Sequence, residues 1–291
     1  MKYIYVNLKR FDILRSLGGV NDLPLEDKEN WAEYIFYRLS KLLNKYSRLD
    51  YQFVFYLPEA YVISAMRALD YDSPIKIGCQ SVYSQDALNT DNIGAFTSYR
   101  PASSMVSIGI EDAIIGHSEE RKGKLDFLSK VSTNKAKTEE VVNHELQKEI
   151  NKAQKAGMNV LYCIGEDIDA RNNHTWKDVI KKQLDLDPAQ VDMSKIKIAY
   201  EPIWAIGPNR TVPDTKSIDE VASYIHSLIG PNIPVLYGGG LKVENAEKIA
   251  EIHSVNGGLI ALTNFSKHVG FYPNQFLNIV DKYIQGDKEN D

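Results

Sequence analysis

The feature that most constrains the fold is a set of eight short apolar runs that recur along the 291 residues, separated by longer stretches of mixed polarity. Runs that are apolar at nearly every position are typical of strands buried on both faces of a parallel sheet. They are YIYV at 3–6, FVFYL at 53–57, IKIGC at 75–79, AIIG at 113–116, VLYCIG at 160–165, IKIAY at 196–200, PVLYG at 234–238 and LIAL at 259–262. Each run predicts a strand.

The segments between the runs carry helical periodicity, as at 31–46, 141–157 and 244–252. Eight repeats of strand and helix predict an α/β fold of the closed (β/α)8 barrel type, which routinely reaches this length as one unit. No linker divides the chain and no tract has low complexity, so a single domain over 1–291 is expected. The tail at 286–291 is expected to fray.

An open, doubly wound sheet is the competing architecture. It would usually place a glycine-rich G-x-G-x-x-G turn after an early strand, because such a turn lets the backbone approach a dinucleotide. Here Asn7, Leu8 and Lys9 follow the first run instead. The closed barrel is therefore favoured.

Composition excludes several kinds of partner. The formal charge of −5 argues against a nucleic-acid partner, which needs a basic face. The apolar start of MKYIYVNLKR is too short for a signal peptide or anchor, so we expect no membrane association and a cytoplasmic location. The two cysteines, Cys79 and Cys163, lie in strand-like runs as buried thiols, and the six histidines lack ligand spacing. We expect no metal and no organic cofactor.

Polar residues directly after the apolar runs are the candidates for chemistry, because active sites of such barrels lie at the carboxyl ends of the strands. Asn7 and Lys9 follow the first run, His117 the fourth and Glu201 the sixth. Each has a plainer alternative: Lys9 as a solvated loop charge, His117 as a hydrogen-bonded core residue, and Glu201 as the cap of a neighbouring helix. Their joint appearance at one mouth favours a catalytic site.

Six motifs carry a family resemblance: VNLK, AFT, IIGHSE, CIGE, AYEPIWAIG and YGG, in this order from the first strand to the seventh. Together they resemble the triosephosphate isomerase family. The resemblance implies interconversion of dihydroxyacetone phosphate and glyceraldehyde 3-phosphate, a role in glycolysis and gluconeogenesis, and a homodimer. It also implies site roles: Asn7 and Lys9 position the substrate, His117 is the electrophile, Glu201 is the base and Gly207 begins a mobile lid.

The chemistry explains these residue types independently. Moving a carbonyl to the adjacent carbon requires one carboxylate that takes a proton and returns it one carbon over, which suits Glu201. Pro202, Ile203 and Trp204 predict an apolar setting that withholds water from this carboxylate. The resulting enediolate carries negative charge that His117 and Lys9 would stabilise, while Asn7 orients the carbonyl. The resemblance further implies a neutral histidine at a helix start, and this neutrality is an established property of the family. The local sequence agrees, because Ser118 is a good N-cap residue and Glu119 would lie in the first turn.

The phosphate end departs from the family pattern. The resemblance places substrate-binding backbone at Gly239 and Gly240 and at the loop after the eighth strand, where Leu262 and Thr263 replace a glycine pair and Gly240 replaces a serine. Asn264 or Ser266 is expected to cap a short phosphate-binding helix. These changes leave two alternatives open: an isomerase of a longer sugar phosphate, such as a tetrulose phosphate, or a barrel that only binds a phosphorylated metabolite.

The dimer surface and one connection also depart from the family. Glu120 stands where the family has arginine, so we expect a reversed ion pair with Arg100 of the other subunit, with Thr97 still entering the neighbouring site. The stretch at 124–140 is rich in Lys, Ser and Thr and is expected to be a surface excursion before a helix, with recognition of a larger substrate as its functional alternative.

Overall fold

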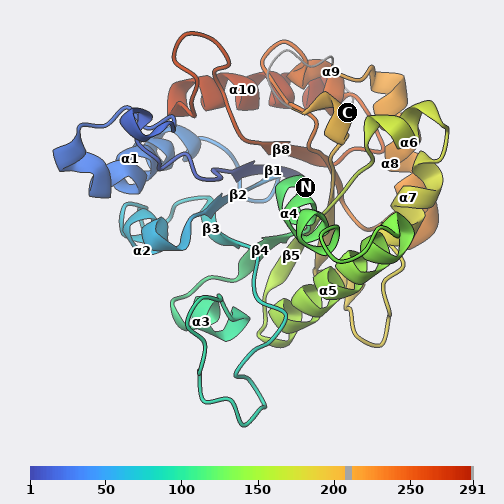
Figure 1. Cartoon of the computed structure of the whole chain (residues 1–291). Coiled ribbons are helices and arrows are strands. Elements are labelled where there is room, and N and C mark those ends of the chain that lie inside the picture. Colours follow the sequence, from blue (N-terminus) through green and yellow to red (C-terminus); the bar gives the residue numbers. More distant parts are fainter. Residues whose placement is uncertain (207–211, 290–291) are drawn as a thin grey trace.

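The computed structural model describes residues 1–206 and 212–289, and its strands close into one parallel barrel (Figure 1). Each strand pairs with the next along the chain, and β8 pairs back with β1. The strands are β1 (Lys2–Asn7), β2 (Tyr51–Leu57), β3 (Ile75–Gln80), β4 (Asp112–Ile115), β5 (Asn159–Ile164), β6 (Ile196–Tyr200), β7 (Val235–Tyr237) and β8 (Gly257–Ile260). All eight apolar runs form strands, and the predicted TIM-barrel class is confirmed.

The last strand begins two residues earlier than its apolar run. Gly257 and Gly258 open β8, where Gly257 lies opposite Tyr3 of β1. A Cβ on Gly257 would lie 1.8 Å from the Tyr3 carbonyl oxygen, so the two backbones approach as only glycine allows. Glycine has low strand propensity, which is why the sequence concealed this start. Leu262 and Thr263 therefore lie within the loop that follows β8.

Helices surround the barrel (Figure 1). Helix α1 shows why: Ile35, Phe36, Leu39 and Leu43 recur at helical spacing and are all buried against the strands. The α-helices are α1 (Trp31–Leu43), α2 (Glu59–Arg67), α3 (Ala102–Ser107), α4 (Ser118–Leu128), α5 (Lys135–Lys155), α6 (Ile168–Asn172), α7 (Trp176–Gln183), α8 (Thr215–Ile229), α9 (Ala246–Ala250) and α10 (Pro273–Glu289). Short 3-10 turns are η1 (Arg15–Leu17), η2 (Leu25–Asn30), η3 (Met193–Lys195) and η4 (Ile203–Ala205).

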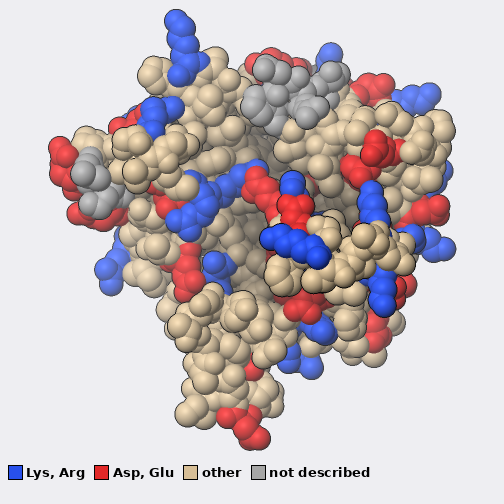
Figure 2. Space-filling model, viewed as in Figure 1, with Lys and Arg blue, Asp and Glu red and all other residues tan. Residues whose placement is uncertain are grey.

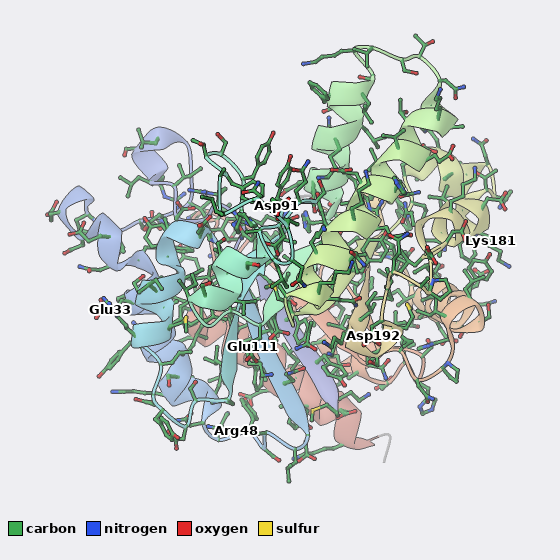
Figure 3. All side chains as sticks on the ribbon, turned by 90° about the horizontal axis from the view of Figure 1, so that it is seen from below. Glu33, Arg48, Asp91, Glu111, Lys181 and Asp192 are labelled. Atoms are coloured by element: carbon green, nitrogen blue, oxygen red, sulfur yellow. The ribbon has the colours of Figure 1, made fainter. Side chains whose placement is uncertain are left out.

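The stretch at 124–140 lies largely at the surface, as expected, but it is not an irregular segment before a helix. Most of it is helical, because α4 runs to Leu128 and α5 already begins at Lys135. Asn134 caps α5 by accepting a hydrogen bond from the Lys137 amide at 3.1 Å, a start signal hidden in a polar stretch. Figure 3 shows the two helices in pale green, joined by a short connection at the upper edge.

The frayed tail is also wrong for residues 286–289, which belong to α10. Gly286 allows α10 to pack closely against α9, because a Cβ at this position would lie 2.3 Å from the Glu247 carbonyl oxygen of α9. Asp287 adds an ion pair with Lys2 at 3.0 Å. None of the helices in the described part of the chain is long and apolar enough to cross a membrane.

The core has two parts. Large side chains fill the barrel interior, where Tyr5 and Tyr56 pack edge to face with their centroids 6.0 Å apart beside Ile114, Leu161 and Leu236. A larger apolar layer separates the strands from the helices. Filling the barrel with side chains leaves the carboxyl ends of the strands as the place for polar chemistry.

Candidate active site

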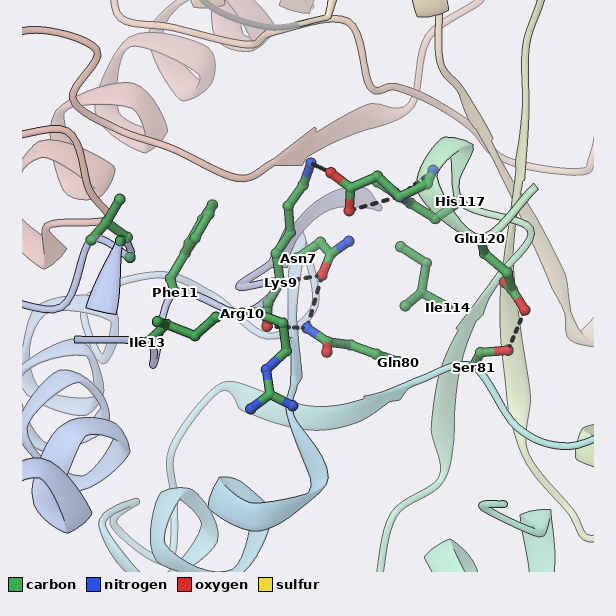
Figure 4. Close-up of a pocket in the computed structure, with 14 residues that line it drawn as sticks. Asn7, Lys9, Arg10, Phe11, Ile13, Gln80, Ser81, Ile114, His117 and Glu120 are labelled. Carbon is green, nitrogen blue, oxygen red and sulfur yellow. Dashed lines mark hydrogen bonds and ion pairs between the residues drawn. The ribbon is translucent and has the colours of Figure 1, made fainter. Parts of the chain in front are cut away.

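Three of the four candidate residues converge at the carboxyl ends of the strands. His117 follows β4 and Glu201 follows β6, and His117 Nε2 lies 3.1 Å from Glu201 Oε1. Lys9 follows β1 and reaches the same place, since its Nζ lies 2.8 Å from Oε1 of Glu119, which neighbours His117 on α4. The barrel thus gathers a carboxylate, an imidazole and an ammonium group from three distant segments. Figure 4 shows two of the three, Lys9 and His117.

Lys9 is held in an unusual backbone conformation. Its φ of +43° lies in the left-handed region, which costs a non-glycine residue of order 1 kcal/mol and persists where neighbours enforce it. Asn7 Oδ1 accepts a hydrogen bond from the Lys9 amide at 3.0 Å, and Gln80 Nε2 donates to the Lys9 carbonyl at 2.9 Å. Gln80 Nε2 also lies 3.1 Å from Asn7 Oδ1. Asn7 and Gln80 therefore fix Lys9.

His117 is itself the N-cap of α4, which corrects the expected cap at Ser118. Its Nδ1 accepts a hydrogen bond from the Glu119 amide at 3.3 Å, and Ser118 is the first helical residue. In a neutral ring whose Nδ1 accepts, the hydrogen resides on Nε2. That hydrogen then faces Glu201, so the helix start selects the tautomer that can donate into the site.

Glu201 is 3% exposed and lies among backbone and small side chains. Its Oε2 accepts a hydrogen bond from the Ser118 amide at 3.0 Å. A Cβ on Gly165 would lie 1.8 Å from the Glu201 carbonyl oxygen, so β5 and β6 backbones touch there. Burial, and next the Glu201 carboxylate, raise the pKa of the Cys163 thiol well above its ordinary value. Glu201 is thus a buried carboxylate in a fixed position.

A second buried carboxylate lies under the segment that leaves β6. Glu166 is fully buried, and its Oε1 accepts hydrogen bonds from the Tyr200 hydroxyl and from Trp204 Nε1, each at 3.0 Å. Burial raises the pKa of Glu166, although these two donors oppose the shift. They anchor Trp204 at the start of the predicted lid. Gly207, Pro208, Asn209 and Arg210 lie outside the described residues.

The site opens into a cavity of about 570 Å³. Its lining includes Lys9, His117, Gln80 and Phe11, and it also includes Gly19 in the loop after β1. Figure 2 shows this hollow near the centre of the face, with basic and acidic side chains around its rim. The cavity therefore has room for more than the reacting atoms.

The loop after β8 satisfies much of its own backbone. The amides of Thr263 and Asn264 both donate to the Gly270 carbonyl, at 3.0 and 3.1 Å. Thr263 Oγ1 accepts from the Tyr272 amide at 2.8 Å. Residues 261–272 contain no helix, so the short helix expected to be capped by Asn264 or Ser266 is absent. The predicted donor at Thr263 is already engaged.

The loop after β7 is different. Gly240 has a φ of +99°, and no described residue accepts a hydrogen bond from the amides of Gly239 or Gly240. This loop touches the carboxylate, because a Cβ on Gly238 would lie 3.0 Å from Glu201 Cγ. The Lys242 side chain bends back over Gly240, and its Nζ lies 4.2 Å from the centre of the Phe265 ring. The loop thus touches Glu201 at Gly238 and offers, further along, the Gly239 and Gly240 amides and the Lys242 ammonium group.

A family model described as triosephosphate isomerase matches residues 29–282. The chain belongs to the triosephosphate isomerase family. The triosephosphate isomerase of Trichormus variabilis is 32% identical over 190 residues, which cover 65% of this chain and 70% of that protein. That of Alkaliphilus metalliredigens is 30% identical over 233 residues, covering 76% and 85%. The crystal structure of Bartonella henselae triosephosphate isomerase, at 23% identity, shares the fold with a TM-score of 0.70, over 97% of this chain and 99% of that one.

Family and fold together support an isomerase. Three further residues of this chain contribute contacts in or next to the site. Sequence reasoning missed the contributions of Gln80, which fixes Lys9, Glu119, which pairs with it, and Arg121, which binds the Gly116 carbonyl at 2.9 Å. Gln80 ends β3 at the carboxyl edge, so the rule that selected His117 could have found it. Nothing local marked Arg121, whose partners come from β4 and β5.

Proposed function

We propose that this chain is a cytoplasmic, cofactor-free isomerase that interconverts dihydroxyacetone phosphate and glyceraldehyde 3-phosphate through an enediolate. The observation that carries the proposal is the 3.1 Å approach of His117 Nε2 to Glu201 Oε1, with the other imidazole nitrogen already occupied by the Glu119 amide. A buried base beside a fixed proton donor is what proton transfer next to a carbonyl requires.

In this proposal Glu201 removes the proton from the carbon beside the substrate carbonyl and returns it to the neighbouring carbon. The Ser118 amide holds one carboxylate oxygen, which leaves Oε1 as the atom that faces the imidazole. His117 then donates from Nε2 to the substrate oxygen on which negative charge develops. One carboxylate is sufficient, because both carbons of the enediolate lie within reach of the same oxygen.

Lys9 and Asn7 stabilise the same charge from the opposite side. The Lys9 ammonium group lines the cavity and is 20% exposed, held by Glu119 in the absence of substrate. Asn7 uses Oδ1 for the Lys9 amide and Gln80, so its amide nitrogen is the group left to orient the carbonyl. Fixed donors of this kind need no reorganisation when charge appears.

The anionic end of the substrate would meet Gly239, Gly240 and Lys242, with Leu262 and Thr263 as neighbours. The engaged amides of Thr263 and Asn264 favour a second candidate, a longer sugar phosphate such as a tetrulose phosphate. Such a substrate would place its phosphate farther from Glu201, where the Lys242 ammonium group supplies positive charge.

We also propose a homodimer. Residues 81–101 form a loop that extends away from the barrel at the bottom of Figure 1, and Figure 3 labels Asp91 within it. Ile93 in this loop is 99% exposed, while Tyr83 and Tyr99 stack at 3.9 Å to stiffen it. An exposed apolar tip on a stiff loop suits the cavity of a second copy, as the family resemblance implies for Thr97.

The reversed ion pair expected between Glu120 and Arg100 finds no support. Arg100 Nε binds Glu59 at 3.0 Å within its own chain, and Glu120 binds Ser81 and the Gly116 amide. The dimer is tested by sedimentation instead. Ile93→Asp should sediment as a monomer at concentrations where the wild type sediments as a dimer, whereas equal sedimentation coefficients for the two proteins across the dilution series would contradict the proposed contact.

Deuterium exchange tests the reaction. The chain is incubated in D2O with dihydroxyacetone phosphate or with a tetrulose phosphate, and label at the carbon beside the carbonyl is measured by NMR. Label in the triose supports the first candidate, and label in the tetrulose alone supports the second. No label with either substrate would favour a barrel that only binds phosphorylated metabolites. Glu201→Asp is the control, since withdrawing the base by one methylene should abolish most exchange.

A further inference from the structure

Two neighbouring glutamates lie close to the helix start that His117 caps: Glu149 is buried, and Glu120 is part-buried with 18% of its side chain exposed. Glu120 is on the first turn of α4, and Glu149 is on α5 with only 4% of its side chain exposed. Ser81 lies between them, with its Oγ 2.8 Å from Glu120 Oε1 and 3.1 Å from Glu149 Oε2. Lys124 approaches both carboxyls, at 3.2 and 2.6 Å. Ser81 and Lys124 thus bring the two carboxyl groups into one contact network.

The second oxygen of Glu120 is bound to the backbone next to His117. Glu120 Oε2 accepts a hydrogen bond from the Gly116 amide at 2.7 Å. Arg121, the next residue, donates to the Gly116 carbonyl at 2.9 Å, so both polar groups of Gly116 are held from α4. Gly116 has a φ of +78° and directly precedes the imidazole that caps the helix. The backbone conformation of Gly116 therefore determines the position of His117.

The two glutamates have pKa values shifted in opposite directions. Burial first, and then the negative charge of Glu120, raise the pKa of Glu149 to about 9. Burial opposes ionisation of Glu120 as well, but hydrogen bonding with Glu149 and the Lys124 charge outweigh it, so the pKa of Glu120 is lowered. At neutral pH Glu120 is the anion and Glu149 is the neutral donor. Two adjacent carboxylates in a buried site cannot both ionise without repulsion.

We propose that Glu120 is a positioning residue for His117, acting through Gly116, and that it does so only while Glu149 keeps its proton. Loss of that proton sets two negative groups against each other beside Ser81. Ser81 has a φ of +67°. Its amide donates a hydrogen bond to the Ile114 carbonyl and its carbonyl accepts one from the Arg100 side chain, so Ser81 has little freedom to adjust. The repulsion between the two carboxylates then displaces Glu120 and weakens its hydrogen bond with the Gly116 amide.

The other ionisable groups around the pair are already engaged. Glu145 on α5 binds Ser84 and Lys148, and Glu119 on α4 binds Lys9. The charged groups that face the pair from its surroundings are Lys124 and Arg121 of α4, Glu145 of α5 and Arg100 of the loop before α3. The buried Cys163 thiol has its pKa raised well above the ordinary value, which removes it from the same pH range.

The test reads the imidazole itself, because this inference rests on the proposed role of His117. Protein labelled with 15N in histidine is titrated from pH 7 to 10, and the two ring nitrogens of His117 are followed by NMR. The wild-type resonances should move with a midpoint near 9, the pKa of Glu149, whereas Glu149→Gln should show no such transition. Glu145→Gln, one turn away on α5, should titrate as the wild type does.

A second pair of variants isolates the bond to Gly116. Glu120→Ala should displace the His117 resonances at pH 7, and Glu120→Gln should restore them, since its amide oxygen still accepts from Gly116. With an active substrate, kcat of the wild type should fall about tenfold per pH unit above 9 while KM stays constant. Identical His117 titrations in wild type and Glu149→Gln would overturn the proposal, and this holds even if no sugar phosphate turns over.

Discussion

On the β1–β4 side of the mouth, hydrogen bonds to neighbouring backbone and side-chain groups hold Lys9, Gln80 and His117 in place. On the β7–β8 side, the loops form hydrogen bonds mainly within themselves. The first side directs donors into the cavity, with Asn7 and Gln80 fixing Lys9 and the start of α4 fixing His117. On the second side the Thr263 amide is turned to Gly270. Under the proposed function, proton transfer and recognition of the anion therefore fall on separate parts of this site, and mutation should separate them.

The largest effect is expected at the base. Glu201→Gln keeps the shape and the bond from Ser118 but cannot accept the substrate proton, so kcat should fall by about 10³ with KM nearly constant. Steady-state kinetics with the substrate found by deuterium exchange provide the measurement. A loss smaller than tenfold would mean that another group acts as the base.

The next effect separates chemistry from stability on the β1–β4 side. Lys9→Gly and Lys9→Met both remove the ammonium group, so each should lower kcat by about 10². Only glycine suits a φ of +43°, so Lys9→Gly should unfold at the higher temperature of the two by about 2 °C. Kinetics and thermal denaturation are measured in parallel. Equal kcat in wild type and Lys9→Gly would remove Lys9 from the mechanism.

A smaller effect is expected where Gln80 supports Lys9. Gln80→Leu leaves the Lys9 carbonyl and Asn7 Oδ1 without this donor, and should lower kcat about tenfold and stability by about 1 kcal/mol. Gln52→Leu is the matched control, because Gln52 accepts a hydrogen bond from Tyr5 in the barrel interior, away from the site. It should cost stability without changing kcat. Equal losses of kcat in Gln80→Leu and Gln52→Leu would contradict a specific role for Gln80 in supporting Lys9.

The sequence predicted the barrel well because its signal is local. Runs of Val, Ile and Leu identify a buried strand wherever they occur, and all eight formed one. Two features were not predicted. The glycine start of β8 depends on close contact with Tyr3, and the helix start within 124–140 depends on a cap at Asn134. The same limit applies to the site: strand ends located His117 and Glu201, but no local pattern could pair Glu120 with Glu149.

On the β7–β8 side the expected effects are weaker and fall on KM. Lys242→Met should raise KM by up to roughly fivefold with kcat unchanged, the size of an exposed charge pair of about 1 kcal/mol. Lys248→Met, on an exposed position of α9, is the control and should behave as wild type. A change in kcat for Lys242→Met, with KM unaffected, would show that the two functions are not separated as described.

The smallest effect concerns stability against pH. The folded chain keeps the Glu149 proton to about pH 9, whereas an unfolded chain releases it near the ordinary value of 4.5. A raised carboxyl pKa gives stability that is present below 4.5 and is lost as pH rises toward 9. Glu149→Gln lacks this loss, so the difference between its unfolding temperature and that of the wild type should be larger at pH 8.5 than at pH 5. Equal differences at both pH values would contradict a protonated Glu149.

The contact between Gly165 and the Glu201 carbonyl has a consequence for how the sequence can vary. The backbones that leave β5 and β6 meet there without any intervening atom, so every substitution at Gly165 must push the segment that carries Glu201, the proposed base. A saturation library at this codon should therefore yield folded barrels whose turnover falls with the size of the new side chain, although residue 165 itself offers the substrate no functional group.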